Sequence, residues 1–475
     1  MSSVSESLNV FGEYYNIING ERQRTTKTRN GIDPATGQSL PEVPVATEND
    51  VYNTVEAAKA AFKIWPLVSW ADRRRAILAY LTEIEGLADD LARLLTLEQG
   101  KPLIFAKMEI TSALDFSRVL AKMELEEETI YSDPDRKTVI RYTPLGVAVA
   151  IVPWNFPIQL ALTKIVPALV TGNPIILKPS PFTPYCGLKI VELAQKFFPK
   201  GVLQFLSGDD NLGPWLTAHP DVAKISFTGS SFTGKKVMES ASKTLKRVTL
   251  ELGGNDPANI AAVAPKIVEF SFVNSGQVCV AIKRIYVHED IYEPFLDAMV
   301  AYIKTLSIGD GLETGNFFGP VQNLQQFTHV KRFFADIENE KLTVAVGGKN
   351  EVRPGYFITP TIIDRPPDNS RIATMEPFGP IVPVMQWKDE EDVIARANST
   401  SMGLGASVWS SSPENASRIA RQLQAGSVWV NTHLQLNPSA PFGGHKESGI
   451  GHELGLGSLK SYCNIQSLFL IKNPI

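Results

Sequence analysis

Apolar positions in the N-terminal region recur with the period of amphipathic helices. In residues 48–64 they return every three or four positions behind a polar start, and residues 71–97 continue with alanine, leucine and charged residues at the same spacing. This pattern predicts helices in both segments. Residues 129–141 are strand-like around Asp133-Pro134-Asp135, which predicts a β-hairpin.

From residue 147 onward, short apolar runs alternate with helical stretches. The first series predicts strands at 147–152, 174–177, 203–206 and 224–227, separated by helices from about Leu160 and at 185–198 and 234–244. A second series predicts strands near 285–287, 344–347, 381–384, 406–409 and 427–430. Such alternation is typical of right-handed βαβ units and an open parallel sheet, so we expect an α/β fold. Residues 461–471 alternate enough to form one more strand, which implies an edge partner.

Composition narrows the class of protein. A chain of 475 residues is too long for one core, so two or three domains are expected. A net charge of −4 gives no electrostatic reason to expect nucleic acid, and small molecules are the better guess for partners. The three cysteines, Cys186, Cys279 and Cys463, form no CxxC pair, so we expect no metal cluster and a reducing compartment.

Targeting signals are not evident in the sequence. Residues 1–12 are polar and acidic, unlike a signal peptide, and no apolar run reaches the roughly 20 residues that a membrane span requires. We therefore expect a cytoplasmic protein that does not associate with membranes.

Three polar side chains lie in settings that suit catalysis. Cys279 follows Gly276-Gln277-Val278, Glu251 ends an apolar run before two glycines, and Asn155 lies on a turn between two prolines. A lone cysteine in apolar surroundings is more often a core residue, and a glutamate at a strand end is as often simply solvated. An asparagine held rigidly on a turn, however, is what an oxyanion donor requires.

Two further segments suggest an anion site. Residues 225–234 read as strand, glycine turn and helix, and the N–H groups of such a helix start could hold a pyrophosphate. The segment is not a GxGxxG motif, so this signal alone is weak. Lys178 ends another predicted strand, where a ribose-binding lysine could lie, although most exposed lysines are merely solvated.

Taken together, these elements resemble one family. The chain resembles the aldehyde dehydrogenase superfamily from about Asn19 to Ser461, with all motifs in family order. The motifs are Pro-Trp-Asn-Phe-Pro (153–157), Lys-Pro-Ser (178–180), Phe-Thr-Gly-Ser (227–230), Glu-Leu-Gly-Gly (251–254), Gly-Gln-Val-Cys (276–279), Glu-Pro-Phe-Gly-Pro (376–380) and Pro-Phe-Gly-Gly (441–444).

The resemblance implies roles for individual residues. Cys279 corresponds to the nucleophile, Glu251 to the general base, Asn155 and the Cys279 N–H to the oxyanion hole, and Glu453 to a carboxylate that relays protons. The positions that correspond to cofactor contacts are Trp154, Lys178, Ser180, Pro181, Gly229, Ser230, Glu376 and Phe378. The implied reaction is the oxidation of an aldehyde to a carboxylic acid by NAD or NADP, through a thiohemiacetal and a thioester on Cys279.

The sequence departs from the family pattern at three places. Many NAD-preferring members carry glutamate where Pro181 stands, and without that carboxylate a 2′-phosphate is no longer repelled, so we expect NADP to be tolerated. His452 replaces a common arginine, which makes the relay through Glu453 less secure. The stretch between Glu251 and Cys279 is also short, around residues 259–264.

The aldehyde pocket can be outlined by position. We expect Leu160, Thr163, Val273, Val280 and either His433 or Leu434 to line it, although each could equally be a core residue. These mostly aliphatic side chains favour a neutral aldehyde over a semialdehyde or a betaine aldehyde.

Other functions remain open on the sequence alone. A CoA-acylating dehydrogenase would have the same fold, but Glu251 favours hydrolysis. A non-catalytic structural member would typically have lost Cys279 or Asn155, and an esterase would not need the cofactor motifs.

The resemblance also implies a domain plan. A Rossmann-like cofactor domain would comprise residues 1–124 and 145–249, and an α/β catalytic domain residues 250–443. A small β arm for oligomerisation, with the C-terminal segment, would comprise residues 125–144 and 444–475 and lead to a homodimer or homotetramer.

Overall fold

The computed structural model describes residues 8–259, 264–349 and 353–472. Part of the expectation for residues 1–12 and most of the short stretch around 259–264 therefore lie outside the described residues.

The first sheet has eight strands in the order β2-β1-β9-β8-β7-β10-β11-β23, of which β9 to β11 run parallel. The strands are β1 (Asn16–Ile18), β2 (Glu21–Gln23), β7 (Val147–Ile151), β8 (Ile175–Lys178), β9 (Leu203–Phe205), β10 (Val222–Thr228), β11 (Arg247–Glu251) and β23 (Gly449–Ile450). The four strands predicted between residues 147 and 227 are confirmed.

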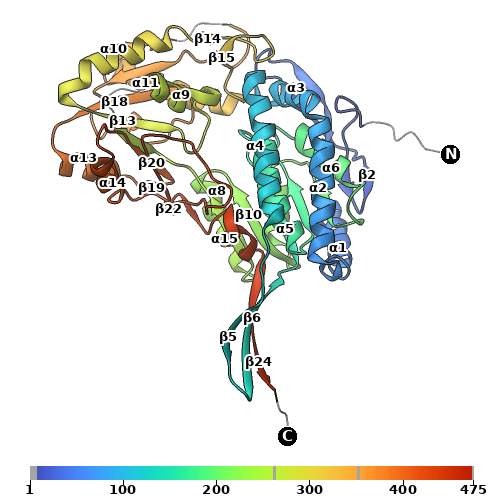
Figure 1. Ribbon diagram of the computed structural model, residues 1–475. Helices are drawn as coiled ribbons and strands as arrows, with labels where there is room; N and C mark the ends of the chain where they lie inside the picture. Colours follow the sequence, from blue (N-terminus) through green and yellow to red (C-terminus); the bar gives the residue numbers. More distant parts are fainter. Residues whose placement is uncertain (1–7, 260–263, 350–352, 473–475) are drawn as a thin grey trace.

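Helices cover both faces of this sheet, because alternate side chains of each strand point in opposite directions. On β7, Ala148 and Ala150 pack against helices α2 (Trp70–Gly86), α3 (Ala88–Gln99), α4 (Leu103–Lys122), α5 (Pro157–Val170) and α6 (Tyr185–Ala194). Val147, Val149 and Ile151 pack instead with α1 (Glu48–Phe62), α7 (Leu212–Ala218) and α8 (Ser231–Ser242). The layers are visible in Figure 1.

The helix predicted over residues 71–97 is two helices. α2 ends at Gly86 and α3 begins at Ala88, with Leu87 at φ −107° and ψ 10° between them. Both helices bury apolar residues in the same core.

The second sheet has seven strands in the order β16-β17-β18-β13-β12-β20-β21, all parallel except for the pair β16–β17. They are β12 (Asp256–Asn259), β13 (Ile282–His288), β16 (Thr343–Val346), β17 (Thr361–Asp364), β18 (Ile381–Trp387), β20 (Gly405–Val408) and β21 (Ser427–Val430). The sequence predicted five of them and missed β12 and β17. Helices α9 (Ala264–Phe272), α10 (Tyr292–Ile303), α11 (Leu324–Asn339), α12 (Arg371–Thr374), α13 (Glu390–Asn398) and α14 (Pro413–Ala420) complete this part.

A three-stranded arm extends from the body of the molecule (Figure 1). The predicted hairpin forms β5 (Glu128–Ser132) and β6 (Arg136–Pro144), and the predicted C-terminal strand forms β24 (Cys463–Ile471), which pairs with β6 along its whole length. The arm exposes large apolar side chains, including Ile130, Ile465, Phe469 and Ile471.

The C-terminal segment contributes to several parts of the fold. β22 (His445–Lys446) pairs with β19 (Met402–Gly403), β23 pairs with β11 of the first sheet, and α15 (Gly455–Lys460) leads into β24 of the arm. Together, the two mixed sheets with flanking helices confirm the expected α/β class. No helix in the described ranges is long and apolar enough to cross a membrane.

Candidate active site

The predicted site residues follow neighbouring strands of the first sheet. Lys178 ends β8 opposite Ile151 of β7, and Glu251 ends β11 opposite Thr228 of β10. Asn155 lies four residues after Ile151, and Gly229 directly follows Thr228. Because these strands are parallel, all four residues lie at one edge of the sheet, where open α/β folds bind their ligands.

A buried ion pair hydrogen-bonds to the backbone of Asn155. Lys101 Nζ donates to the Asn155 backbone oxygen at 2.8 Å and lies 2.5 Å from Glu109 Oε2, with both side chains fully buried. Glu109 Oε1 accepts hydrogen bonds from the N–H groups of Ile158 and Gln159, at the start of α5. This network fixes the turn to the helix that follows it.

Cys279 follows a strained turn. Asn274, Ser275 and Gly276 adopt left-handed backbone conformations, with φ of 52°, 53° and 74°. At Gly276 a Cβ atom would lie 2.3 Å from the carbonyl oxygen of Gly379, so only glycine fits. Non-glycine residues are rarely left-handed, and such strain is usually retained at functional sites.

Hydrogen bonds join the Asn155 turn to the Cys279 segment. Asn155 Nδ2 donates to the carbonyl oxygen of Gln277 at 3.0 Å, and Asn274 Nδ2 donates to the carbonyl oxygen of Asn155 at 3.3 Å. The amide of Asn155 is buried and retains a second hydrogen for another acceptor.

The two glycines after Glu251 permit close contacts. A Cβ atom on Gly253 would lie 2.4 Å from Glu376 Oε2, and one on Gly254 would lie 2.6 Å from the carbonyl oxygen of Cys279. The Glu-Leu-Gly-Gly motif therefore brings the chain that follows Glu251 against both the Cys279 peptide and Glu376.

Glu251 is buried, and neither of its carboxylate oxygens has a hydrogen-bond partner in the structure. Burial raises the pKa of this carboxyl well above its usual value, and the negative charge of Glu453 raises it further. The positive charge of Lys164 opposes both effects. Glu251 therefore keeps its proton to a higher pH than an exposed glutamate does.

Glu453 is paired with Lys164, which is fully buried on α5. Glu453 Oε1 accepts hydrogen bonds from Lys164 Nζ and, at 3.1 Å, from Ser226 Oγ, while Lys164 Nζ also donates to Thr228 Oγ1 at 2.7 Å. This polar chain leads from the neighbourhood of Glu251 into the first sheet.

The Cys279 thiol is strongly affected by its surroundings. Burial raises its pKa to about 12; the charge of Lys283 opposes this, whereas Glu376, Asp256 and Glu251 raise the pKa. A thiol with such a pKa is a poor nucleophile at neutral pH, so activation requires a change in this environment.

On the expected cofactor side, Lys178 Nζ donates to the carbonyl oxygen of Pro179 at 3.1 Å. Burial lowers its pKa to about 8. The Ser180 hydroxyl accepts a hydrogen bond from the Phe182 N–H, and Pro181 is half-buried beside it. Ser230 caps α8 by accepting from the Thr233 N–H at 3.2 Å, immediately after Gly229.

The Glu376–Phe378 segment faces Trp154 from the second sheet. The rings of Trp154 and Phe378 pack edge to face with centroids 5.4 Å apart, and Phe378 has φ 48°. Gln326 on α11 donates to the carbonyl oxygens of Pro377 and Phe378 and so fixes this conformation. Glu376 lies 3.0 Å from Lys283 Nζ.

Of the expected pocket residues, Val273 and Val280 belong to the apolar cluster that contains Cys279, together with Leu434, Phe156 and Phe442. Thr163 is buried, and Leu160 packs against the first core. His433 is fully buried and contacts the carbonyl oxygen of Val280 at 2.6 Å, and burial lowers its pKa to about 4. Leu434 thus shares an apolar cluster with Cys279, whereas His433 contacts the Val280 backbone.

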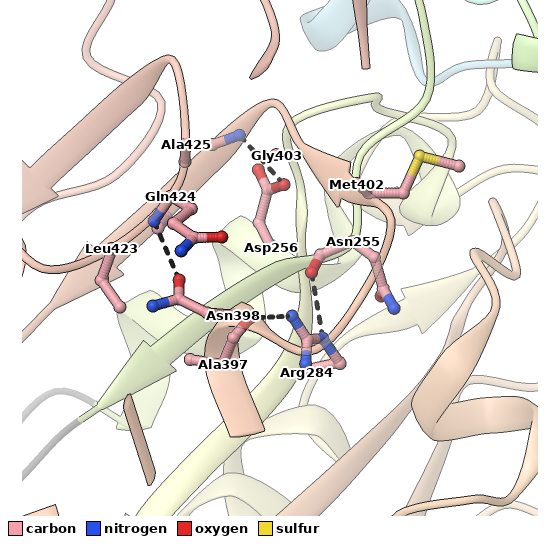
Figure 2. Close-up of a pocket in the computed structure, with 12 residues that line it drawn as sticks. Asn255, Asp256, Arg284, Ala397, Asn398, Met402, Gly403, Leu423, Gln424 and Ala425 are labelled. Carbon is pink, nitrogen blue, oxygen red and sulfur yellow. Dashed lines mark hydrogen bonds between the residues drawn. The ribbon is translucent and has the colours of Figure 1, made fainter. Parts of the chain in front are cut away.

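A small pocket lies at the start of β12, where Asn255, Asp256 and Arg284 line it together with residues from 397–406 and 423–425 (Figure 2). Arg284 is fully buried there and donates to the carbonyl oxygens of Asn255 and Ala397 at 3.0 and 2.7 Å. Asp256 accepts from the Gly405 N–H, and burial raises its pKa to about 7, opposed by the charge of Lys283. These contacts join the start of β12 to β13 and β20.

Sequence reasoning missed several polar residues of the site, namely Lys101, Glu109, Lys164, Lys283 and Gln326. Three of them are buried lysines; Lys164 and its partner Glu453 are 289 positions apart, whereas Lys101 and its partner Glu109 are 8 positions apart. A lysine within a mostly apolar run, such as Lys164 in residues 157–170, could have indicated a buried charged side chain.

Comparisons with known proteins agree with these motifs. The model of the aldehyde dehydrogenase family matches residues 21–468. A putative aldehyde dehydrogenase of Gibberella fujikuroi, FUS7, is 40% identical over 97% of this chain and 100% of its own length. The NAD+ complex of an aldehyde dehydrogenase from Bacillus cereus has a TM-score of 0.94 at 35% identity and covers 98% of each chain. An NADP-dependent enzyme from E. coli has a TM-score of 0.94 at 35% identity and covers 97% of this chain and 98% of its own.

Proposed function

The chain belongs to the aldehyde dehydrogenase family, and we propose that it oxidises an aldehyde to a carboxylic acid with NAD or NADP, through a covalent thioester on Cys279. Glu251 is the general base for hydrolysis of the thioester in this proposal, and Asn155 is a donor of the oxyanion hole.

One observation carries the proposal: the Asn155 turn, the Glu251 strand and the Cys279 segment meet at one place. Asn155 Nδ2 bonds to the carbonyl of Gln277, two residues before Cys279, and Gly254, three residues after Glu251, abuts the Cys279 carbonyl. This convergence of three separate segments supports assigning a nucleophile, a base and an amide donor to one site.

The residues present fit a dinucleotide. Within the described ranges, Lys178 Nζ donates to the carbonyl oxygen of Pro179 and keeps hydrogens for a ligand, and the Glu376 carboxylate is partly exposed beside Lys283, so each can bind ribose hydroxyls. Gly229 and the start of α8 offer N–H groups that suit a pyrophosphate. Trp154 and Phe378 would flank the nicotinamide end.

In the first half of the reaction, the Cys279 thiolate attacks the aldehyde carbon, and a carbon–sulfur bond forms while the carbonyl oxygen becomes an alkoxide. Asn155 Nδ2 and the Cys279 N–H stabilise that alkoxide; one such donor contributes about 10²–10³ in rate. A bound nicotinamide would supply the acceptor for the hydride that leaves this carbon, and Cys279 would then carry the thioester.

In the second half, Glu251 accepts a proton from water as the water oxygen attacks the thioester carbon. The carbon–sulfur bond then breaks, and Cys279 leaves as a thiolate with the carboxylic acid as product. Glu453 and Lys164 would carry the proton away from Glu251, which is supported by their direct ion pair and by the influence of both charges on its pKa.

For the cofactor, the proposal includes tolerance of NADP as well as NAD. Pro181 offers no carboxylate to repel a 2′-phosphate. Lys178 and Arg29 form no ion pair within the described ranges; burial lowers the pKa of Lys178, the charge of Asp210 raises it, and that of Arg29 lowers it. Two cations that make no ion pair can interact with an additional phosphate, although the charge of Asp210 opposes this.

For the substrate, the proposal favours a neutral aldehyde. The cluster around Cys279 is apolar and contains Val273, Val280 and Leu434, and the nearby ammonium of Lys283 is already paired with Glu376. A charged substrate would therefore contact apolar side chains, and Lys283 would not be free to pair with its charge.

The proposal extends to organisation and location. The domain division given above, with the arm pairing two subunits of a homodimer or homotetramer, is supported by the apolar side chains exposed on β24. A cytoplasmic location is supported by the three cysteines, all of which are free thiols.

The decisive experiment compares the wild type with Cys279→Ala on a panel of aldehydes, following reduced cofactor by absorbance for NAD and for NADP. We expect neutral aldehydes to be oxidised to acids without CoA, and Cys279→Ala to be inactive. Undiminished turnover by Cys279→Ala, or acyl-CoA formation in place of acid when CoA is added, would overturn the proposed mechanism. Cys463→Ala is the matched control for loss of a remote thiol.

A further inference from the structure

Lys283 connects the nucleophile directly to Glu376. Its side chain is buried near the start of β13, where Nζ donates to the carbonyl oxygen of Cys279 at 2.6 Å and lies 3.0 Å from Glu376 Oε1. The mechanism above assigns it no role.

The Lys283–Glu376 pair is open to solvent on the carboxylate side. Lys283 Nζ lies 3.0 Å from Glu376 Oε1, and the Glu376 side chain is 17% exposed whereas that of Lys283 is 3% exposed. Burial of charges costs several kcal/mol per ion unless hydrogen bonds complete the pair. Burial raises the pKa of Glu376, with Lys283 opposing that effect. A carboxylate held in this way can exchange part of its contact with Lys283 for hydroxyl donors of a ligand.

The field at the Cys279 sulfur depends on the same pair. Four charged groups act on the thiol: Lys283 favours the thiolate, and Glu376, Asp256 and Glu251 favour the thiol. Asp256 lies on β12 beside the Cys279 peptide, and Glu251 ends β11. The more completely Glu376 neutralises Lys283, the less the ammonium group can stabilise a thiolate.

We propose that Lys283 is a positioning residue that couples occupancy of the nicotinamide-ribose site to the reactivity of Cys279. When ribose hydroxyls donate to Glu376, the carboxylate moves away from Lys283, and the ammonium charge then favours loss of the thiol proton to water. The S–H bond breaks, the electron pair stays on sulfur, and no oxidation occurs. This proposal rests on the assignment of Glu376 as a ribose ligand in the proposed function.

The test measures the pH dependence of Cys279 alkylation by iodoacetamide, with the modified peptide quantified by mass spectrometry. The reaction joins the sulfur to the reagent's methylene carbon and releases iodide, and it requires no aldehyde oxidation. We expect Lys283→Met to raise the apparent thiol pKa by about one unit, which slows alkylation about tenfold at a pH below that pKa. Lys283→Arg should retain most of the wild-type profile.

A second variant should shift the apparent pKa of the Cys279 thiol in the opposite direction. Glu376→Gln removes the neutralising charge but leaves Lys283 in place, so it should lower the apparent thiol pKa. Lys246→Met is the control, because Lys246 is also buried but bonds only to the carbonyl oxygens of Thr217 and His219. Its Cys279 profile should match the wild type.

The ligand arm uses NADH, which carries the ribose hydroxyls without the positive charge of the oxidised ring. We expect NADH to lower the apparent pKa in the wild type and to have a much smaller effect in Lys283→Met. The pKa is compared rather than the absolute rate, since a bound dinucleotide also restricts access of the reagent.

Unchanged profiles in Lys283→Met, or shifts of the same sign in Lys283→Met and Glu376→Gln, would overturn the proposal. If Lys283→Met does not fold, Glu376→Gln must still lower the apparent pKa and Lys283→Arg must still respond to NADH. Inactivity of the protein toward every aldehyde would overturn the proposed function but would leave the alkylation results interpretable.

Discussion

The buried ammonium group of Lys101 donates a 2.8 Å hydrogen bond to the backbone carbonyl oxygen of Asn155. The amide donor proposed for the oxyanion hole is therefore fixed through its own main chain by a residue that lies 54 positions earlier. The two prolines that flank Asn155 are therefore not the only residues that fix its position.

Lys101→Met should weaken both stability and turnover. It leaves Glu109 buried without its cation, which costs about 3–5 kcal/mol of unfolding free energy, and it releases the Asn155 turn, which can reduce kcat up to about 100-fold. Lys101→Met combined with Glu109→Gln should recover stability, because the buried charge is gone, but not kcat. Thermal melting and steady-state rates separate the two effects, and full recovery of kcat in the double variant would contradict the role of Lys101.

Glu251→Gln should stop the reaction after the first half. The amide cannot accept a proton from water, so the thioester should persist on Cys279 after one equivalent of reduced cofactor has formed. Rapid mixing should record that burst, and intact-protein mass spectrometry should detect the acyl adduct. Normal steady-state turnover without an adduct would exclude Glu251 as the base.

The raised pKa of Glu251 also predicts how stability depends on pH. The folded state holds this proton to a higher pH than the unfolded chain, whose carboxyl has a pKa near 4.5. Between that value and the raised pKa, the folded state binds more protons, so this group's contribution to the unfolding free energy falls as pH rises. Glu251→Gln should therefore gain stability relative to the wild type at pH 8 compared with pH 4. Parallel denaturation curves at the two pH values would refute this.

Pro181→Glu should shift the protein toward NAD. A carboxylate at this position repels a 2′-phosphate and can accept hydrogen bonds from a ribose diol, so kcat/KM for NADP should fall about tenfold or more, or about 1.4 kcal/mol. Pro181→Gln is the matched control without charge and should change the NADP value much less. Equal losses in both variants would point to the loss of proline rather than to charge.

Phe469→Asp should disrupt the proposed oligomer. Phe469 is 79% exposed on β24. A buried, unpaired carboxylate at a subunit interface is strongly unfavourable, so sedimentation should detect a shift to smaller species. Asn464→Asp, on the same strand, introduces the same charge and should leave the assembly intact. An unchanged assembly in Phe469→Asp would place the subunit contact elsewhere.

The sequence provided candidate residues where a single polar side chain lies in a local motif. Cys279, Glu251 and Asn155 are of this kind. It did not predict the buried lysines, because the partner of Lys164 is 289 positions away and that of Lys283 lies on a distant loop. Long-range pairs leave no periodic pattern in a single chain.

The fold was predictable to a similar extent. Apolar strands such as residues 147–151 stand out because both of their faces are buried. β12 was missed because it has four residues that include Asp256 and Pro257, which ordinarily argue against a central strand. Its pairing with both β13 and β20 comes from the tertiary fold.

The short strand β23 pairs Gly449 with Glu251 and Ile450 with Leu250, and the same stretch of chain runs on through α15 into β24. Shortening the protein at about residue 444 would therefore do more than prevent subunits from associating. The shortened protein would lack β23, which pairs with Glu251, and would also lack Glu453. We therefore expect the deletion to impair hydrolysis of the thioester even where the coenzyme still binds.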